Sequence, residues 1–258
     1  MTKEEFLEDK YIKCFIKWFI EKLTSGFSHS YNTKKPKKEY NFKSIYEAYE
    51  KYEWNGKNLD ENNKELKQWS DLLTKSIENN NETECKNICR NILKWGGINK
   101  TKIITETPDL IGILKEAKIK LSKDEIHSHN YYNNILMSTG LSKIYSLYIP
   151  DFIIYDSRVR AAICHLVREF WIEKKLDFIP ENLKFAYTSG KSKSNRNPNT
   201  NTFKFTYCSV SHKYQYIITN IKANWLLKEI LNKSSLFKNL REIEAALFMI
   251  GYEIPTIS

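Results

Sequence analysis

The chain has 258 residues, of which 41% are hydrophobic and 14% aromatic, so it is not intrinsically disordered and is long enough for one large domain or two small ones. Its net charge of +10 favours a polyanionic partner, most often nucleic acid, although a chain rich in Lys, Asn and Ile can also acquire such a charge from AT-rich coding DNA. We expect a cytoplasmic protein, because its five cysteines are scattered. We also expect it to bind no membrane, because no apolar run is as long as a transmembrane helix.

The first half of the chain is predicted to be helical. Residues 24–41 are polar and contain the sequence KKPKK, which predicts a loop. Trp54 begins a turn, and Trp95 precedes two glycines that end a helix. The helices predicted from apolar spacing cover residues 4–24, 42–53, 61–78 and 82–93.

The second half continues this pattern, with helices predicted over residues 108–118, 124–137, 157–174, 218–231 and 240–250. Residues 202–208 alternate in the manner of a short strand. The fold class is therefore mainly α, with room for a small β-hairpin. Cys85 and Cys89 lie four residues apart, but no second pair has ligand spacing, so we expect no metal and no cofactor.

The most informative segment is STGLSKIYSLYIPDFIIYDSRVR, residues 138–160. Gly140 gives the backbone freedom for a turn, and Ser142 is the predicted N-cap of a helix whose first turn holds Lys143. A cation is disfavoured at this positive end of the helix dipole, so burial there would favour the neutral amine, which is the nucleophile. Asp156 is predicted to cap the next helix. The two residues could act together on a sugar carbon, or could be a solvated surface lysine and an ordinary helix cap.

These residues resemble the hairpin and the aspartate of the helix–hairpin–helix DNA glycosylase superfamily, in particular its 8-oxoguanine-glycosylase-like branch. The chain is also similar to small bacterial proteins of this branch through the sequences WGG, YDSRV, RNP and EAALFMIGY, which begin at residues 95, 155, 196 and 244. The resemblance covers most of the chain beyond about residue 90. It implies that Lys143 is the Schiff-base lysine and Asp156 the catalytic carboxylate of a bacterial protein.

The resemblance also implies a fold and an activity. The fold would be one compact unit of residues 1–258 with two helical lobes and a cleft between them. The hairpin would lie in a lobe of about residues 60–175, and residues 1–59 and 176–258 would form the other lobe. The activity would be that of a monomeric DNA glycosylase, with or without lyase activity, that flips a damaged or modified base out of double-stranded DNA for repair or antiviral defence.

The contacts to DNA are predicted from charge and aromatic residues. Residues 182–228 contain eight basic residues and no acidic ones. The core of this window, residues 189–197, is either a phosphate-binding loop or a solvated surface loop. Trp54 and Trp95 are the predicted base pocket, with ordinary packing as the alternative. The predicted DNA-binding residues are Gly140, Ser142, Arg158, Arg160, Lys191, Lys193 and Arg196. A non-catalytic protein that grips phosphates with the hairpin and the basic loop at residues 184–196 is the alternative function.

Overall fold

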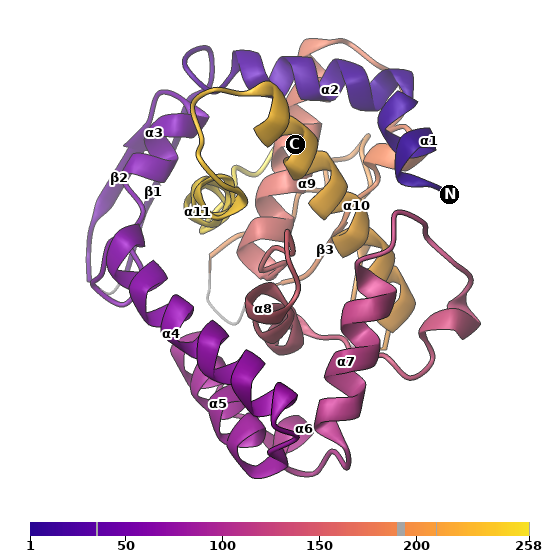
Figure 1. Cartoon of the computed structure of the whole chain (residues 1–258). Coiled ribbons are helices and arrows are strands. Elements are labelled where there is room, and N and C mark those ends of the chain that lie inside the picture. The colour runs from indigo at the N-terminus through magenta and orange to yellow at the C-terminus, as the bar shows by residue number, and fades with distance from the viewer. Residues whose placement is uncertain (35, 190–193, 210, 258) are drawn as a thin grey trace.

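The computed structural model describes residues 1–34, 36–189, 194–209 and 211–257 (Figure 1). This part of the chain contains eleven α-helices and two sheets of two strands each, which confirms the mainly α class. Lys191 and Lys193, two of the predicted DNA contacts, lie outside the described residues. Among the helices that the structure describes, none combines the length and the apolar character required to cross a bilayer.

The chain begins with two helices where one was predicted, α1 (Lys3–Glu8) and α2 (Lys10–Glu21). The break lies at Asp9, whose carboxylate accepts the backbone N–H groups of Tyr11 and Ile12 and so caps α2. The prediction of a loop over residues 24–41 was wrong in part, because β1 (His29–Asn32) and β2 (Glu39–Phe42) form an antiparallel hairpin.

The hairpin forms because one face of β1 is apolar. His29 and Tyr31 are buried while Ser30 and Asn32 are exposed, and the ring of Tyr31 stacks on Tyr40 of β2 at a centroid distance of 5.2 Å. The polar sequence KKPKK lies in the connection between the strands and hid this alternation.

After α3, which packs on α11 (Leu240–Ile250) near the end of the chain, the next helices pack mainly on one another. Helices α4, α5, α7 and α8 form one group, which occupies the lower half of Figure 1. The helices of this part of the chain are α3 (Ile45–Glu50), α4 (Leu59–Glu78), α5 (Glu82–Trp95), α6 (Lys102–Thr105), α7 (Leu110–Leu121) and α8 (Thr139–Tyr148). The helix predicted over residues 124–137 is absent and only a 3-10 turn, η1 (His129–Tyr132), forms there, because its asparagines favour turns over helix.

The remaining helices are arranged around α9 (Ser157–Glu173), which lies in the middle of the molecule and is mostly buried (Figure 1). It packs against α2 and α11 (Leu240–Ile250), while α10 (Lys213–Lys233) packs on α1, α2 and α11. The predicted strand at 202–208 is reduced to β4 (Thr206–Tyr207), which pairs in parallel with β3 (Ala186–Tyr187) after the 3-10 turn η2 (Glu181–Leu183).

Candidate active site

The start of α8 differs from the prediction. Ser138 rather than Ser142 caps the helix, because Ser138 has an extended backbone and its Oγ accepts the N–H of Leu141 at 3.2 Å. Ser142 is buried inside the helix and donates its hydroxyl hydrogen to the carbonyl of Thr139 at 3.0 Å, so it does not offer this hydroxyl to a phosphate. Lys143 is accordingly the fifth residue of α8, beyond its first turn.

Gly140 serves a different purpose from the predicted turn. It lies within α8 and has no positive φ. A β-carbon on Gly140 would approach Leu93 Cδ2 to 2.9 Å, so the absence of a side chain allows α8 to pack closely on α5.

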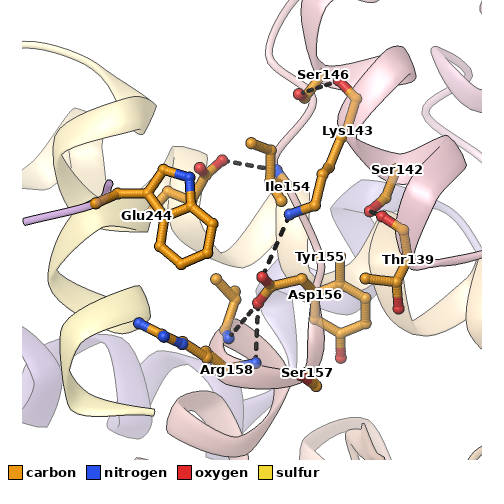
Figure 2. Close-up of polar contacts among 12 residues, drawn as sticks. Thr139, Ser142, Lys143, Ser146, Ile154, Tyr155, Asp156, Ser157, Arg158 and Glu244 are labelled. Atoms are coloured by element: carbon orange, nitrogen blue, oxygen red, sulfur yellow. Dashed lines mark hydrogen bonds and ion pairs between the residues drawn. The ribbon is translucent and has the colours of Figure 1, made fainter. Parts of the chain in front are cut away.

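The aspartate lies where the sequence predicted, at the N-cap of α9. One carboxylate oxygen of Asp156 accepts the backbone N–H groups of Arg158 at 2.9 Å and Val159 at 3.1 Å. The other oxygen faces Lys143, whose Nζ lies 3.4 Å from Oδ2. Figure 2 shows the two side chains pointing towards each other from α8 and from the start of α9. The structure therefore brings the predicted amine and carboxylate together.

The surroundings of Asp156 favour its charged form. Burial by itself would raise the pKa of this carboxyl group, but the ammonium of Lys143, the N–H of Val159 and the guanidinium groups of Arg158 and Arg196 outweigh burial and hold the pKa below its usual value. Asp156 is therefore a carboxylate at neutral pH and can stabilise positive charge that develops nearby.

The pair lies in a cavity of about 740 Å³. Lys143 and Asp156 line it although their residues are only 5% and 8% exposed, so the pair is largely shielded from bulk solvent. Segments far apart in the chain contribute the other walls, including the residues after α3, the end of α5, and α11. The aromatic residues of the lining are Tyr52, Trp54, Trp95 and Phe248.

The two predicted pocket tryptophans, Trp54 and Trp95, both line this cavity. The indole N–H of Trp54 donates to the carbonyl of Trp95 at 3.2 Å, and that of Trp95 donates to Asn62 Oδ1 at 3.0 Å. These bonds hold the rings at a centroid distance of 6.4 Å, edge to face. Lys143 Nζ lies 5.9 Å from the centroid of Trp95, so the aromatic wall borders the ion pair.

Two of the predicted arginines also line the cavity. Arg158 extends from the first turn of α9 (Figure 2). Its guanidinium lies 4.1 Å from the ring centroid of Phe248 of α11. Arg196 donates from Nη1 to Ser157 Oγ at 2.5 Å and from Nε to the carbonyl of Tyr252 at 3.4 Å. Both cations therefore lie beside Asp156.

Arg160 does not belong to this set. It is 1% exposed, and its guanidinium donates to the carbonyls of Ala186 at 3.0 Å and Tyr187 at 3.4 Å while stacking on Tyr216. These contacts anchor β3 to α9. We therefore correct the prediction that Arg160 contacts DNA, because the helical period turns it into the core, away from the cavity wall that Arg158 lines.

Sequence reasoning missed a second carboxylate in the cavity, Glu244 of α11. Its Oε2 accepts the N–H of Ile154 at 2.6 Å and its Oε1 accepts Nη1 of Arg241 at 2.5 Å, which ties the segment before Asp156 to α11 (Figure 2). Burial raises the pKa of Glu244, against the opposing effects of Arg241, the Ile154 N–H and Lys143. A glutamate inside the apolar run of α11 was the signal that could have revealed it.

The described residues contain no group of three or more His, Cys, Asp or Glu side chains placed to hold a metal ion. The chemical groups that the cavity does offer are two amines, two carboxylates, guanidinium groups and aromatic faces. Compared with family models, with curated proteins and with solved structures, the chain matches none of them.

Proposed function

We propose that this protein is a DNA glycosylase that excises a damaged or modified base from double-stranded DNA and forms an imine through Lys143. The observation that carries the proposal is the 3.4 Å separation of Lys143 Nζ and Asp156 Oδ2 inside a cavity of about 740 Å³. Aromatic walls beside this pair suit a base that has been flipped out of the helix.

The proposed reaction begins when the target nucleotide enters the cavity. Asp156 stabilises the positive charge at C1′ as the glycosidic C–N bond breaks and its electron pair leaves with the base. Lys143 passes a proton to the departing base, and its free amine forms a bond to C1′ while Asp156 stays a carboxylate. The C1′–O4′ bond then breaks as a C1′=N imine forms, and a proton of the nitrogen bonded to C1′ passes to O4′.

The proposed fold is of the helix–hairpin–helix glycosylase type, with two helical lobes on either side of the cavity. The separate packing of α4, α5, α7 and α8 supports this arrangement, since α5 and α8 line one side and α9 and α11 the other. A lobe boundary between Tyr148 and Ser157 suits the packing better than one near residue 175, because α9 packs on α2 and α11. The proposed activity suits two biological roles, the repair of damaged bases and the removal of modified bases from viral DNA.

Trapping with borohydride tests the imine. Duplexes that contain an abasic site or a modified base are incubated with the protein and borohydride, which reduces an imine to a stable amine adduct. We expect an adduct with the natural protein and none with Lys143→Ala. Lys100→Ala is the matched control, because Lys100 lines the same cavity but is exposed, and we expect it to retain the adduct.

The aspartate is tested separately by base release. Asp156→Asn keeps a side-chain oxygen for the helix cap but loses the negative charge, so release should fall by roughly 100-fold or more while DNA binding stays nearly unchanged. Base release without an adduct would replace the imine by a water that Asp156 activates. Salt-sensitive DNA binding with no release from any duplex would instead support the non-catalytic DNA-binding alternative.

A further inference from the structure

Arg158 is a partly buried cation with an unusual, largely aromatic environment. The ring centroids of Phe248, Tyr252 and Trp54 lie 4.1, 4.8 and 5.4 Å from its guanidinium carbon. Aromatic rings pack against the faces of a guanidinium and accept no N–H donor in its plane. Within the described residues no side-chain or backbone oxygen accepts a hydrogen bond from this guanidinium, although it lines the cavity.

Apart from the exposed Lys100, the other cations of the cavity wall have acceptors. Lys143 pairs with Asp156, Arg241 pairs with Glu244, and Arg196 donates to Ser157 Oγ. Arg158 differs from them because its charge is balanced only at a distance. Burial lowers its pKa, with Asp156 the main opposing influence, so the surroundings leave the cation incompletely compensated. An acceptor supplied by a ligand would satisfy the free donors.

The size of the cavity leaves room for such an acceptor. Its volume of about 740 Å³ lies in the upper part of the range, roughly 300–1,000 Å³, that is typical of sites for drug-sized ligands. An unmodified nucleobase is much smaller than such a ligand, so a base that enters here need not fill the space. A substituent on the base can occupy the part of the cavity near Arg158.

We propose that the cavity selects an extruded base that carries a substituent with two oxygen acceptors, and that Arg158 is the residue that binds this substituent. This inference rests on the proposed function, because the base must first be flipped into the cavity. A guanidinium with free in-plane N–H groups matches a pair of oxygen acceptors with two parallel hydrogen bonds. An oxidised guanine, which gains one oxygen beside a ring N–H, is a poorer match for this donor pair.

Binding to DNA that cannot react tests the inference apart from catalysis. Three duplexes of the same sequence carry cytosine, 5-methylcytosine or 5-carboxycytosine on a 2′-fluoroarabino sugar, which blocks cleavage at C1′. Dissociation constants are measured by fluorescence anisotropy. We expect 5-carboxycytosine to bind roughly tenfold more tightly than 5-methylcytosine, since the methyl group adds size without acceptors.

Variants at Arg158 decide whether this residue causes the preference. Arg158→Met should abolish it, and Arg158→Lys, which keeps the charge but loses the paired donors, should leave a smaller one. Lys115→Ala, which removes an exposed lysine that does not line the cavity, should retain it. Circular dichroism verifies that each variant is folded, and the lysine variant serves if the methionine variant is not.

Equal affinity for the three duplexes, or a preference that persists in a folded Arg158 variant, would overturn this inference and leave the glycosylase proposal standing. No binding to any duplex would overturn both.

Discussion

The side chain of Lys143 crosses directly over Gly96. A β-carbon on Gly96 would lie 2.4 Å from Cδ and 2.6 Å from Cε of this lysine, closer than real β-carbons approach other atoms. The glycine that makes room for the amine is therefore the one after Trp95 at the end of α5, whereas Gly140 within α8 meets Leu93 instead. Gly96 leaves free the path along which Lys143 reaches Asp156.

We expect Gly96→Ala to move the amine without unfolding the protein. Gly96 has φ −75° and ψ 10°, which alanine adopts readily, and the atoms in its way belong to a flexible side chain. The free energy of unfolding should change by less than about 1 kcal/mol, while borohydride adduct formation should fall roughly tenfold or more. Urea denaturation and trapping yield measure the two effects.

Ala at Gly140 is the matched control, because its β-carbon would meet Leu93 and leave Lys143 untouched. It should alter stability more than trapping. Unchanged trapping in Gly96→Ala would show that the position of the lysine does not depend on this glycine.

Gly251→Ala, unlike Gly96→Ala, should strongly destabilise the fold. A β-carbon there would lie 1.8 Å from the carbonyl oxygen of Arg158 and 2.5 Å from its carbonyl carbon, and backbone atoms cannot move aside as a lysine side chain can. We expect a loss of roughly 3 kcal/mol or more of unfolding free energy, measured by urea denaturation. A variant as stable as the natural protein would mean that the contact between the end of α11 and the start of α9 is loose.

The comparison of sequence and structure shows which features are local. The Asp156 cap and the bounds of α11 were predicted correctly because a strong N-cap and a helical apolar period are written in neighbouring residues. The cap of α8 was misplaced because Ser138 and Ser142 are both suitable residues, and only the backbone conformation distinguishes them.

Contacts between segments that are distant in the chain could not be predicted from local sequence patterns. No spacing rule joins Gly96 to Lys143 or Glu244 to Ile154, since each pair meets only when helices pack. The pairing of Lys143 with Asp156 was predicted because both lie in one short segment. Arg160 was misassigned because proximity to Asp156 in sequence outweighed the helical period that turns it into the core.

We expect a buried pair of histidines to make the stability of the protein depend on pH. His29 and His165 lie at a ring centroid distance of 5.4 Å, beside Arg168, with Glu169 3.5 Å from His165 Nδ1. Burial, with a smaller contribution from Arg168, lowers the pKa of His29 to about 4, and burial lowers that of His165 as well. Both histidines are therefore neutral in the folded protein at pH values where the unfolded chain takes up protons.

This difference in protonation decides whether stability rises or falls with pH. Above about pH 7 these histidines are neutral in both the folded and the unfolded state, so they add no pH dependence to the free energy of unfolding. As the pH falls below the unfolded pKa of 6.5, the unfolded state takes up protons before the folded state does, and the free energy of unfolding decreases. His29 should contribute a loss of roughly 2 kcal/mol between pH 7 and pH 5. Urea denaturation at both pH values measures it.

His29→Phe should reduce this loss, because phenylalanine can stack on Phe42 as the imidazole does and takes up no proton. The exposed His129 provides the control, since His129→Phe should leave the pH dependence unchanged. Equal pH dependence in His29→Phe and in the natural protein would contradict this account.

Asn62 holds the aromatic wall of the cavity, which gives a final prediction. The residue is fully buried, its amide nitrogen donates to the carbonyls of Trp54, Lys57 and Asn58, and its Oδ1 accepts the indole N–H of Trp95. Asn62→Leu keeps the approximate volume but leaves these buried groups without a partner, so unfolding free energy should fall by roughly 2–4 kcal/mol.

The neighbouring Asn63→Leu is the control for this substitution, since Asn63 is only partly buried and should change stability by less than about 1 kcal/mol. A loosened Trp95 should also weaken binding of unreactive duplexes more in Asn62→Leu than in Asn63→Leu, because the two tryptophans form the wall that a flipped base would contact. Anisotropy at a temperature where both variants are folded measures the difference. Equal affinity of the two variants would show that the Trp54–Trp95 wall does not contact DNA, whatever the loss of stability.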